Sequence, residues 1–253
     1  MLRRSLLTAS LTLLAAAPLA AQAPSDMKAD KKMDHMDKDK KKDEKMEKKM
    51  EKMDKKMDHM DMDKKVKGGP LPTGWSGRTD DKAAKIDEAK FVTMGAGFHV
   101  TSGPAAIYWN AKDVVSGPFT ASATLTQTKA PMHPEAYGVI FSGKKLDAAD
   151  QTYYYFLVRG DGKFLVNHRA GAAVHKIVEW TENAAVKKAD AKGAATNTLT
   201  VDASKADSVR LKVNGVQVAA LSAATAATSG GIVGLRVNHN LDVHIGDFSV
   251  TKK

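Results

Sequence analysis

The chain of 253 residues contains no cysteine. Small exported domains commonly rely on disulfides, and this chain has neither that means of stabilisation nor a thiol to acylate as a lipoprotein. Its stability must therefore come from a hydrophobic core. Residues 70–253 are long enough to supply one, since a domain of about 150 residues buries roughly 68–70% of the surface exposed by its unfolded chain.

The sequence also lacks an apolar run of the about 20 residues that a transmembrane helix needs. The longest apolar stretch, Ser5–Leu19, follows two arginines in Met1–Arg4 and precedes the small residues Ala20 and Ala21. A positively charged start, a short apolar segment and a small-residue exit are typical of a secretory signal peptide. We therefore predict a signal peptide over residues 1–21, no transmembrane anchor, and a location in the bacterial periplasm or outside the cell.

The net charge of +10 is not gathered into one patch. Lysines alternate with acidic residues along residues 28–67, and residues 70–253 are only mildly basic. Proteins that bind nucleic acids usually cluster Lys and Arg on one face or stripe. We therefore expect no nucleic-acid partner.

Several motifs of enzymes and metal centres are also missing. The sequence has no Gly-x-Ser-x-Gly nucleophile elbow and no glycine-rich phosphate loop. Beyond residue 70, no pair of histidines has the spacing of a helical metal motif or a zinc site. We expect no cofactor in this part of the chain.

A low-complexity segment rich in Met, Lys and Asp occupies residues 22–69. Acidic residues often precede lysines by four positions, an arrangement that stabilises a helix by about 0.2–0.5 kcal/mol per pair. We predict a charged arm, helical or disordered, that ends at Gly68–Gly69–Pro70. Its methionines recur at steps of 4, 3, 4 and 3 residues, which places one stripe on a single helix side in a heptad pattern: Met46, Met50, Met53, Met57 and Met60.

Three roles stay open for this arm. Mixed charge runs usually stay solvated, which favours a spacer. The stripe of methionines favours weak self-association, because Met specifies packing poorly. The sequence MDHMD occurs twice and places His35 beside Met36 and His59 beside Met60. Thioether sulfur suits copper, and imidazole suits copper or zinc, although adjacent residues do not share a helix face, so metal capture would require the helix to open.

Beyond residue 70 the periodicity changes from helical to alternating. Residues 118–127 alternate apolar and polar side chains, and Asp161–Gly162 and Asn214–Gly215 each separate two alternating runs. Both dipeptides are strong hairpin signals. About a dozen such strand segments are present, and helix-like segments are few, chiefly residues 80–90. We predict an all-β fold, an antiparallel β-sandwich of the jelly-roll type, over residues 70–253.

The order of these segments resembles a known family. AYGVIFSG precedes YYYFLVRGDGKF, followed by a Trp-ended strand VEW, a VNG hairpin and a late GLRV. This order is similar to the exported bacterial domains called 3-keto-disaccharide hydrolase or family-16-glycoside-hydrolase-like, which are concanavalin A-like lectin/glucanase jelly rolls. The resemblance covers residues 95–250 and implies carbohydrate binding or cleavage on a concave sheet. The arm resembles the Met-Lys-Asp pentapeptide-repeat segments of small exported bacterial proteins.

Cleavage of a glycoside usually needs two carboxylates about 5–9.5 Å apart. The chain has no Glu-x-Asp-x-x-Glu run, but Glu135 and Glu179 lie within strand-like segments. Glu179 precedes Trp180, and an apolar neighbour favours the neutral form that a general acid needs. Glu179 and Glu135 are therefore the candidate catalytic residues of an enzyme acting on disaccharide-type substrates, 3-keto-disaccharides included.

Binding of a sugar needs aromatic faces and polar side-chain tips. Alternation places Arg236 and Asn238 on one face of their strand, and Asp242 and His244 on one face of the next strand. We expect these consecutive strands to be neighbours that present all four side chains on one surface. The candidate binding residues are Trp109, Tyr153, Tyr155, Arg159, Trp180, Arg236, Asn238, Asp242 and His244.

The leading prediction is an exported, non-catalytic module that binds a carbohydrate or another cell-envelope polymer. The competing interpretation of the same residues is aromatic side chains packed in the core and a solvated outer sheet face. The alternatives from other classes are a glycoside-hydrolase-like enzyme and the capture of copper or zinc by the arm.

Overall fold

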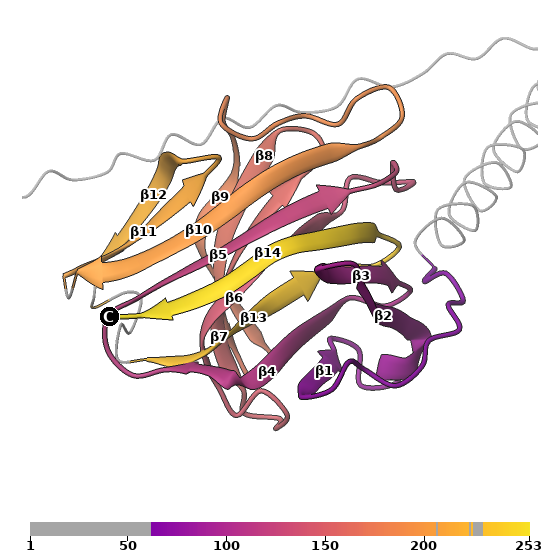
Figure 1. The fold of residues 1–253 in the computed structure, drawn as a ribbon, viewed down its shortest axis with the longest axis horizontal. Helices are drawn as coiled ribbons and strands as arrows, with labels where there is room; N and C mark the ends of the chain where they lie inside the picture. The colour runs from indigo at the N-terminus through magenta and orange to yellow at the C-terminus, as the bar shows by residue number, and fades with distance from the viewer. Residues whose placement is uncertain (1–61, 206, 223, 225–229) are drawn as a thin grey trace, which may run out of the picture. The chain divides into compact units, whose positions relative to one another are not determined.

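The computed structural model describes residues 62–205, 207–222, 224 and 230–253, and almost all of these form β-strands and their turns. Figure 1 shows the strands as two layers stacked face to face. The predicted all-β sandwich is thus confirmed. Within the described residues, no helix has the length and apolar character to cross a membrane. The predicted signal peptide and the candidate metal ligands of the arm lie outside the described residues: His35, Met36, His59 and Met60.

The first layer, sheet A, contains seven of the described strands in the order β1-β4-β13-β6-β7-β8-β9. Every neighbouring pair is antiparallel. The strands are β1 (Trp75–Thr79), β4 (Ala106–Val115), β13 (Gly231–Val237), β6 (Ala136–Lys144), β7 (Thr152–Arg159), β8 (Lys163–Ala170) and β9 (Ala173–Glu182).

The second layer, sheet B, contains seven further described strands in the order β12-β11-β10-β5-β14-β3-β2. It lies in front of sheet A in Figure 1. The strands are β12 (Val216–Ser222), β11 (Ser208–Val213), β10 (Ala195–Lys205), β5 (Phe119–Gln127), β14 (Asp242–Lys252), β3 (Gly97–Ser102) and β2 (Ala89–Met94).

Sheet B has one apolar face and one polar face. Buried and partly exposed residues alternate along the whole of β5, because successive side chains of a strand point to opposite faces. The inward set, which includes Leu125, joins the main core between the sheets. The outward set includes threonines whose hydroxyl groups bond across to β10, with Thr124 Oγ1 3.0 Å from Thr198 Oγ1.

The two predicted hairpins are confirmed. Asp161 and Gly162 lie in the turn between β7 and β8, and Asn214 and Gly215 join β11 to β12. Asn214 and Gly215 have φ values of 51° and 84°, which is the left-handed conformation that a two-residue type I′ hairpin requires at both positions. The Asn214 side chain also accepts a hydrogen bond from the Thr198 amide at 2.9 Å, which ties the turn to β10.

The helix predicted over residues 80–90 is wrong. This segment forms bends, one short 3-10 turn over Ile86–Glu88 and the start of β2. The Thr79 hydroxyl donates to the carbonyl oxygens of Asp81 and Ala84, both at 2.9 Å, and the Asp81 carboxylate accepts from the Ala83 amide at 2.8 Å. Local side-chain bonds of this kind compete with the hydrogen bonds of a helix.

Residues 62–69, which the sequence assigns to the arm, are bonded to the jelly roll. The Asn240 carboxamide oxygen accepts from the Lys64 amide at 2.6 Å, and its nitrogen donates to the Met62 carbonyl at 3.2 Å. The Gly68 amide donates to the Asp87 carbonyl at 2.8 Å. The domain described here therefore includes residues upstream of position 70.

The main core provides a test of the sandwich. Leu125 is fully buried between the sheets, so Leu125→Ala should lower the free energy of unfolding by about 2–5 kcal/mol through lost contacts and a residual cavity. Val114→Ala is the matched control, because the Val114 side chain is 48% exposed, and it should change stability by less than about 0.5 kcal/mol. Urea unfolding followed by circular dichroism measures both, and equal losses would contradict the assigned core.

Candidate functional site

Sheet A buries apolar side chains on both of its faces. Along β6, Tyr137 and Val139 join the main core, whereas Ala136 and Ile140 join a second cluster on the face turned away from sheet B. An antiparallel sheet of this kind usually leaves its second face solvated, so this cluster needs an explanation. We call it the outer cluster. Its members are Ile107, Trp109, Ala136, Ile140, Leu146, Tyr153, Tyr155, Leu157 and Leu165, with Trp180 and Ile232 at its margin.

Two tyrosines of β7 lie in this cluster. Tyr153 and Tyr155 are two residues apart, so they share a face, and their ring centres are 5.8 Å apart. Asn167 of β8 is directly opposite Tyr155 in the sheet register. Its amide nitrogen donates to the Tyr155 hydroxyl oxygen at 3.0 Å, which fixes the tip of that ring.

An arginine is buried next to these tyrosines. Arg236 of β13 forms a two-point ion pair with Asp80, with its Nη1 and Nη2 atoms 3.0 and 2.5 Å from the two carboxylate oxygens. Nη1 also donates to the Tyr153 hydroxyl at 3.4 Å, and Nε donates to the Asn238 side-chain oxygen at 3.1 Å. The guanidinium carbon lies 5.0 Å from the centre of the Tyr155 ring.

Positive charge exceeds negative charge around Asp80. Burial alone would raise the pKa of the Asp80 carboxyl, but Arg236 and then the more distant charges of Arg169 and Arg78 outweigh burial and lower that pKa. The carboxylate is therefore ionised, and in turn it raises the pKa of Arg236 against the effect of burial. One carboxylate is thus bound by one guanidinium group and feels the charge of two more.

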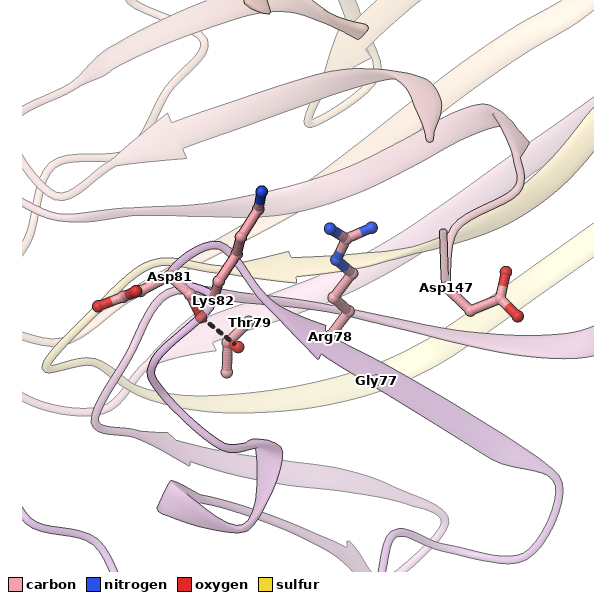
Figure 2. A pocket seen from close by; sticks show the side chains of 6 residues that line it. All are labelled: Gly77, Arg78, Thr79, Asp81, Lys82 and Asp147. Atoms are coloured by element: carbon pink, nitrogen blue, oxygen red, sulfur yellow. Dashed lines mark hydrogen bonds between the residues drawn. The ribbon is translucent and has the colours of Figure 1, made fainter. Parts of the chain in front are cut away.

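Arg78 stands at the β1 edge of this region, beside a hollow of about 320 Å³. Figure 2 shows the charged ends of Arg78 and Lys82 pointing to the same side of this hollow. The Arg78 guanidinium donates to the carbonyl oxygens of Leu146 and Ala148, which anchors the loop between β6 and β7 over the outer cluster. The residues lining the hollow are Gly77, Arg78, Thr79, Asp81, Lys82 and Asp147.

The opposite margin of the face is formed by Trp180 on the edge strand β9. The guanidinium carbon of Arg159 lies 4.2 Å from the centre of the Trp180 ring, a distance at which a cation is attracted to an aromatic face. Asp161 holds this guanidinium by two hydrogen bonds of 3.0 and 2.5 Å. Trp180, Arg159 and Asn167 are all partly exposed.

The expectation that Arg236, Asn238, Asp242 and His244 share one surface is wrong. Strand β13 belongs to sheet A and strand β14 to sheet B. The chain crosses between the sheets after Asn238, where Asn240 adopts a left-handed φ of 60°. Asp242 and His244 therefore lie away from the outer cluster.

Asp242 holds a different part of the fold together. Its carboxylate accepts hydrogen bonds of 2.7 Å from Thr128, His99 and Lys129. Burial alone would raise its pKa, but the hydrogen bonds from Lys129 and Thr128 and the charge of His99 outweigh burial and lower the pKa of Asp242 to about 2. These contacts connect β14 to β3 and to the residues after β5.

The two candidate catalytic acids are far apart. Glu179 lies on β9 with a 67% exposed side chain and pairs with Lys176 at 2.9 Å. Glu135 precedes β6 and accepts from His239 Nε2 at 2.9 Å and from the Asn238 amide at 3.4 Å. Strands β7 and β8 lie between β6 and β9, so three strand spacings, about 14 Å, separate their backbones. The structure does not bring these acids together as a pair.

Asp80 and Asn167 are among the contributors to this face that were not identified from the sequence. Asp80 lies in the segment predicted as a helix and is 156 residues from Arg236, so no local pattern connects the two. Asn167 was detectable in principle, because the β7–β8 hairpin fixes the register that places it opposite Tyr155.

Comparisons with known proteins support the fold. No family model matches the chain, and no curated protein matches it. The carbohydrate-binding module CBM66 from Bacillus subtilis is similar in structure, with a TM-score of 0.52, 16% sequence identity, and coverage of 72% of this chain and 99% of that chain. This likeness supports the predicted jelly-roll β-sandwich fold.

Two further solved structures give lower scores. The carbohydrate recognition domain of Emp46p in its metal-free form has a TM-score of 0.49 and 13% identity, and covers 74% of this chain and 98% of that chain. A family 16 endo-glucanase from Bacteroides ovatus has a TM-score of 0.49 and 7% identity, and covers 73% of this chain and 98% of that chain.

The contribution of the Arg236–Asp80 ion pair can be tested by measuring the free energy of unfolding of variants. Asp80→Asn should lower the free energy of unfolding by about 3–5 kcal/mol, because it leaves a buried guanidinium without a compensating charge. Asp150→Asn removes an exposed partner of Lys145 and should have no measurable effect, since surface ion pairs contribute little. Urea unfolding at neutral pH measures both variants, and similar losses would show that Arg236 does not depend on Asp80.

The lowered pKa of Asp242 leads to a prediction about the stability of the protein in acid. Folding lowers its pKa from an ordinary value of 3.8 to about 2, so its ionised form stabilises the native state at higher pH, and this stabilisation is lost as the pH falls from about 4 to about 2. Asp242→Asn should therefore be less stable than the wild type at pH 5, and the two should converge towards pH 2. Denaturant unfolding along this pH series measures the gap, and a constant gap would refute the assignment.

Proposed function

We propose that the protein is an exported, non-catalytic module that binds a glycan of the cell envelope or its surroundings on the outer face of sheet A. The observation that carries this proposal is the outer cluster with its flanking polar groups. Binding sites for small polar molecules typically combine apolar and aromatic walls with a few fixed donors and acceptors. The outer face of sheet B, with its threonine pairs, has no comparable aromatic set among the described residues.

The burial of each aromatic side chain suggests its part in binding. Tyr153 is fully buried, and Trp109 and Tyr155 are each 7% exposed, so these three form a rigid floor. Trp180 is partly exposed at the edge. Arg159 covers one face of its ring, and the C–H face of a sugar ring would stack on the other.

The polar groups at this face suit sugar hydroxyl groups. Arg159, Asn167 and Arg169 are partly exposed, and each carries N–H donors. Arg159 is held in place by Asp161, and Asn167 by the Tyr155 hydroxyl, so little side-chain entropy would be lost when they bind. Asp80 and Arg236 satisfy each other and keep the neighbouring tyrosines in position.

The similarity to a carbohydrate-binding module supports a glycan ligand, although at 16% identity the ligand itself must be argued from this chain's own residues. The predicted signal peptide supports export, and the charged arm would then serve as a spacer. Capture of copper or zinc by that arm is the alternative from another class, and it concerns residues outside the described part.

The positions of the acids support binding without cleavage. Glycoside hydrolysis usually uses two carboxylates about 5–9.5 Å apart across the scissile bond. Glu135 is engaged by His239 and Asn238, and Glu179 lies three strands away in an exposed pair with Lys176. A hydrolase acting on disaccharides or 3-keto-disaccharides would need a different pair of acids.

The proposal predicts retention of the protein on at least one insoluble polysaccharide or on peptidoglycan. Trp180→Ala should weaken that binding at least about tenfold, or about 1.4 kcal/mol, because it removes the exposed aromatic surface. Thr196→Ala, on the exposed outer face of sheet B, is the matched control and should bind like the wild type. Depletion assays over a concentration series measure the affinities.

Two outcomes would contradict the proposal. One is the absence of retention on any polysaccharide or peptidoglycan, and the other is an equal loss in both variants. Release of soluble sugar from a bound polymer or from disaccharides, abolished in Glu179→Gln or Glu135→Gln, would refute the non-catalytic part alone.

A further inference from the structure

Two histidines face each other at the end of sheet A that lies away from β1. His168 of β8 is directly opposite His175 of β9 in the sheet register. Their Nδ1 atoms are 3.3 Å apart, and their ring planes are inclined by 32° with centres 5.5 Å apart. When both rings are neutral, the Nδ1–H of one ring can donate a long hydrogen bond to the Nδ1 of the other.

The distance between the two Nδ1 atoms matches the distance between two nitrogen ligands of a tetrahedral metal ion. A zinc ion lies about 2.0–2.1 Å from each imidazole nitrogen, and at a tetrahedral angle two such nitrogens are about 3.3–3.4 Å apart. A metal ion bound by both Nδ1 atoms is therefore compatible with the distance between them. Strands β8 and β9 are paired in one antiparallel hairpin, whose turn follows Ala170. This pairing fixes the backbone positions of His168 and His175 relative to each other.

The orientation of the His168 ring is fixed by its surroundings. The ring stacks on Tyr154, a member of the main core, with centres 4.4 Å apart and planes inclined by 29°. His168 is partly exposed and His175 is exposed, so a metal ion can reach both rings from solvent.

We propose that His168 and His175 bind a divalent transition-metal ion through their Nδ1 atoms, with water in the remaining positions. Imidazole suits zinc, copper and nickel. No group of three or more His, Asp or Glu side chains is arranged for a metal in the described part of the chain, so the site has two protein ligands and stays open to a third. It does not depend on the proposed glycan site.

A second pair of opposed histidines lacks this geometry and provides the matched control. His99 of β3 is opposite His244 of β14, but their ring centres are 6.2 Å apart. His99 Nε2 is bonded to Asp242 at 2.7 Å instead. The opposed position in the sheet is thus shared by both pairs, and the 3.3 Å distance between ring nitrogens is that of His168 and His175.

Calorimetric titration of the full chain with zinc chloride at neutral pH tests the proposal. The measurements use a His35→Gln/His59→Gln background, so that the histidines of the arm do not contribute. His168→Gln and His175→Gln should each weaken binding of one zinc equivalent at least tenfold, and His244→Gln should leave that equivalent unchanged. Thermal melts without metal show whether each variant is folded.

Two results would overturn the proposal. One is the absence of zinc binding in the background protein. The other is binding of the same stoichiometry and affinity in His168→Gln, His175→Gln and the background protein. Where a glutamine variant fails to fold, the imidazole NMR signals of His168 and His175 in the background protein replace it, and they must shift on addition of zinc.

Discussion

The guanidinium of Arg236 is buried in the face of a sheet, and it is tolerated there because Asp80 lies against it in a two-point ion pair. A lone buried charge is far less stable than a paired one, so the segment after β1 must fold over β13 for the site to exist. The same guanidinium contacts the Tyr153 hydroxyl and the Tyr155 ring. One ion pair thus sets the position of the aromatic floor on which the proposed glycan site is built.

The two sheets differ in the side chains that they carry on their outer faces. Sheet B follows the usual antiparallel pattern, with one face in the core and one polar face of threonine pairs. Sheet A buries apolar side chains on both faces, because the loop between β6 and β7, which Arg78 anchors, lies over the outer cluster. Arg159, Asn167 and Arg169 at the margin of this face are partly exposed, and these are the polar side chains that the proposed ligand would contact.

Local features could be predicted from the sequence because their causes are local. Alternation identified the strands, and Asn214–Gly215 identified a hairpin because its residues tolerate left-handed backbone. The sandwich followed from the number of strand segments. The aromatic and arginine candidates on β4, β7, β9 and β13 fall on one face because alternation and strand pairing together place them there.

Features that depend on distant pairing could not be predicted. Alternation shows which residues share a face of a strand but not which sheet the strand joins, so Asp242 and His244 were assigned to the wrong surface. Asp80 was hidden in a segment with helical composition, where the hydrogen bonds of Thr79 and Asp81 prevented a helix. His168 and His175 are seven residues apart and meet only because the β8–β9 turn sets their register.

The central claim is that the outer face of sheet A, and not that of sheet B, is the binding surface. Hydrogen exchange of the amide groups, measured by mass spectrometry with and without a polysaccharide that retains the protein, locates that surface directly. The account predicts slower exchange in β7, β8 and β9 on addition of the ligand, and unchanged exchange in β10, β11 and β12. Slower exchange confined to the strands of sheet B would contradict it.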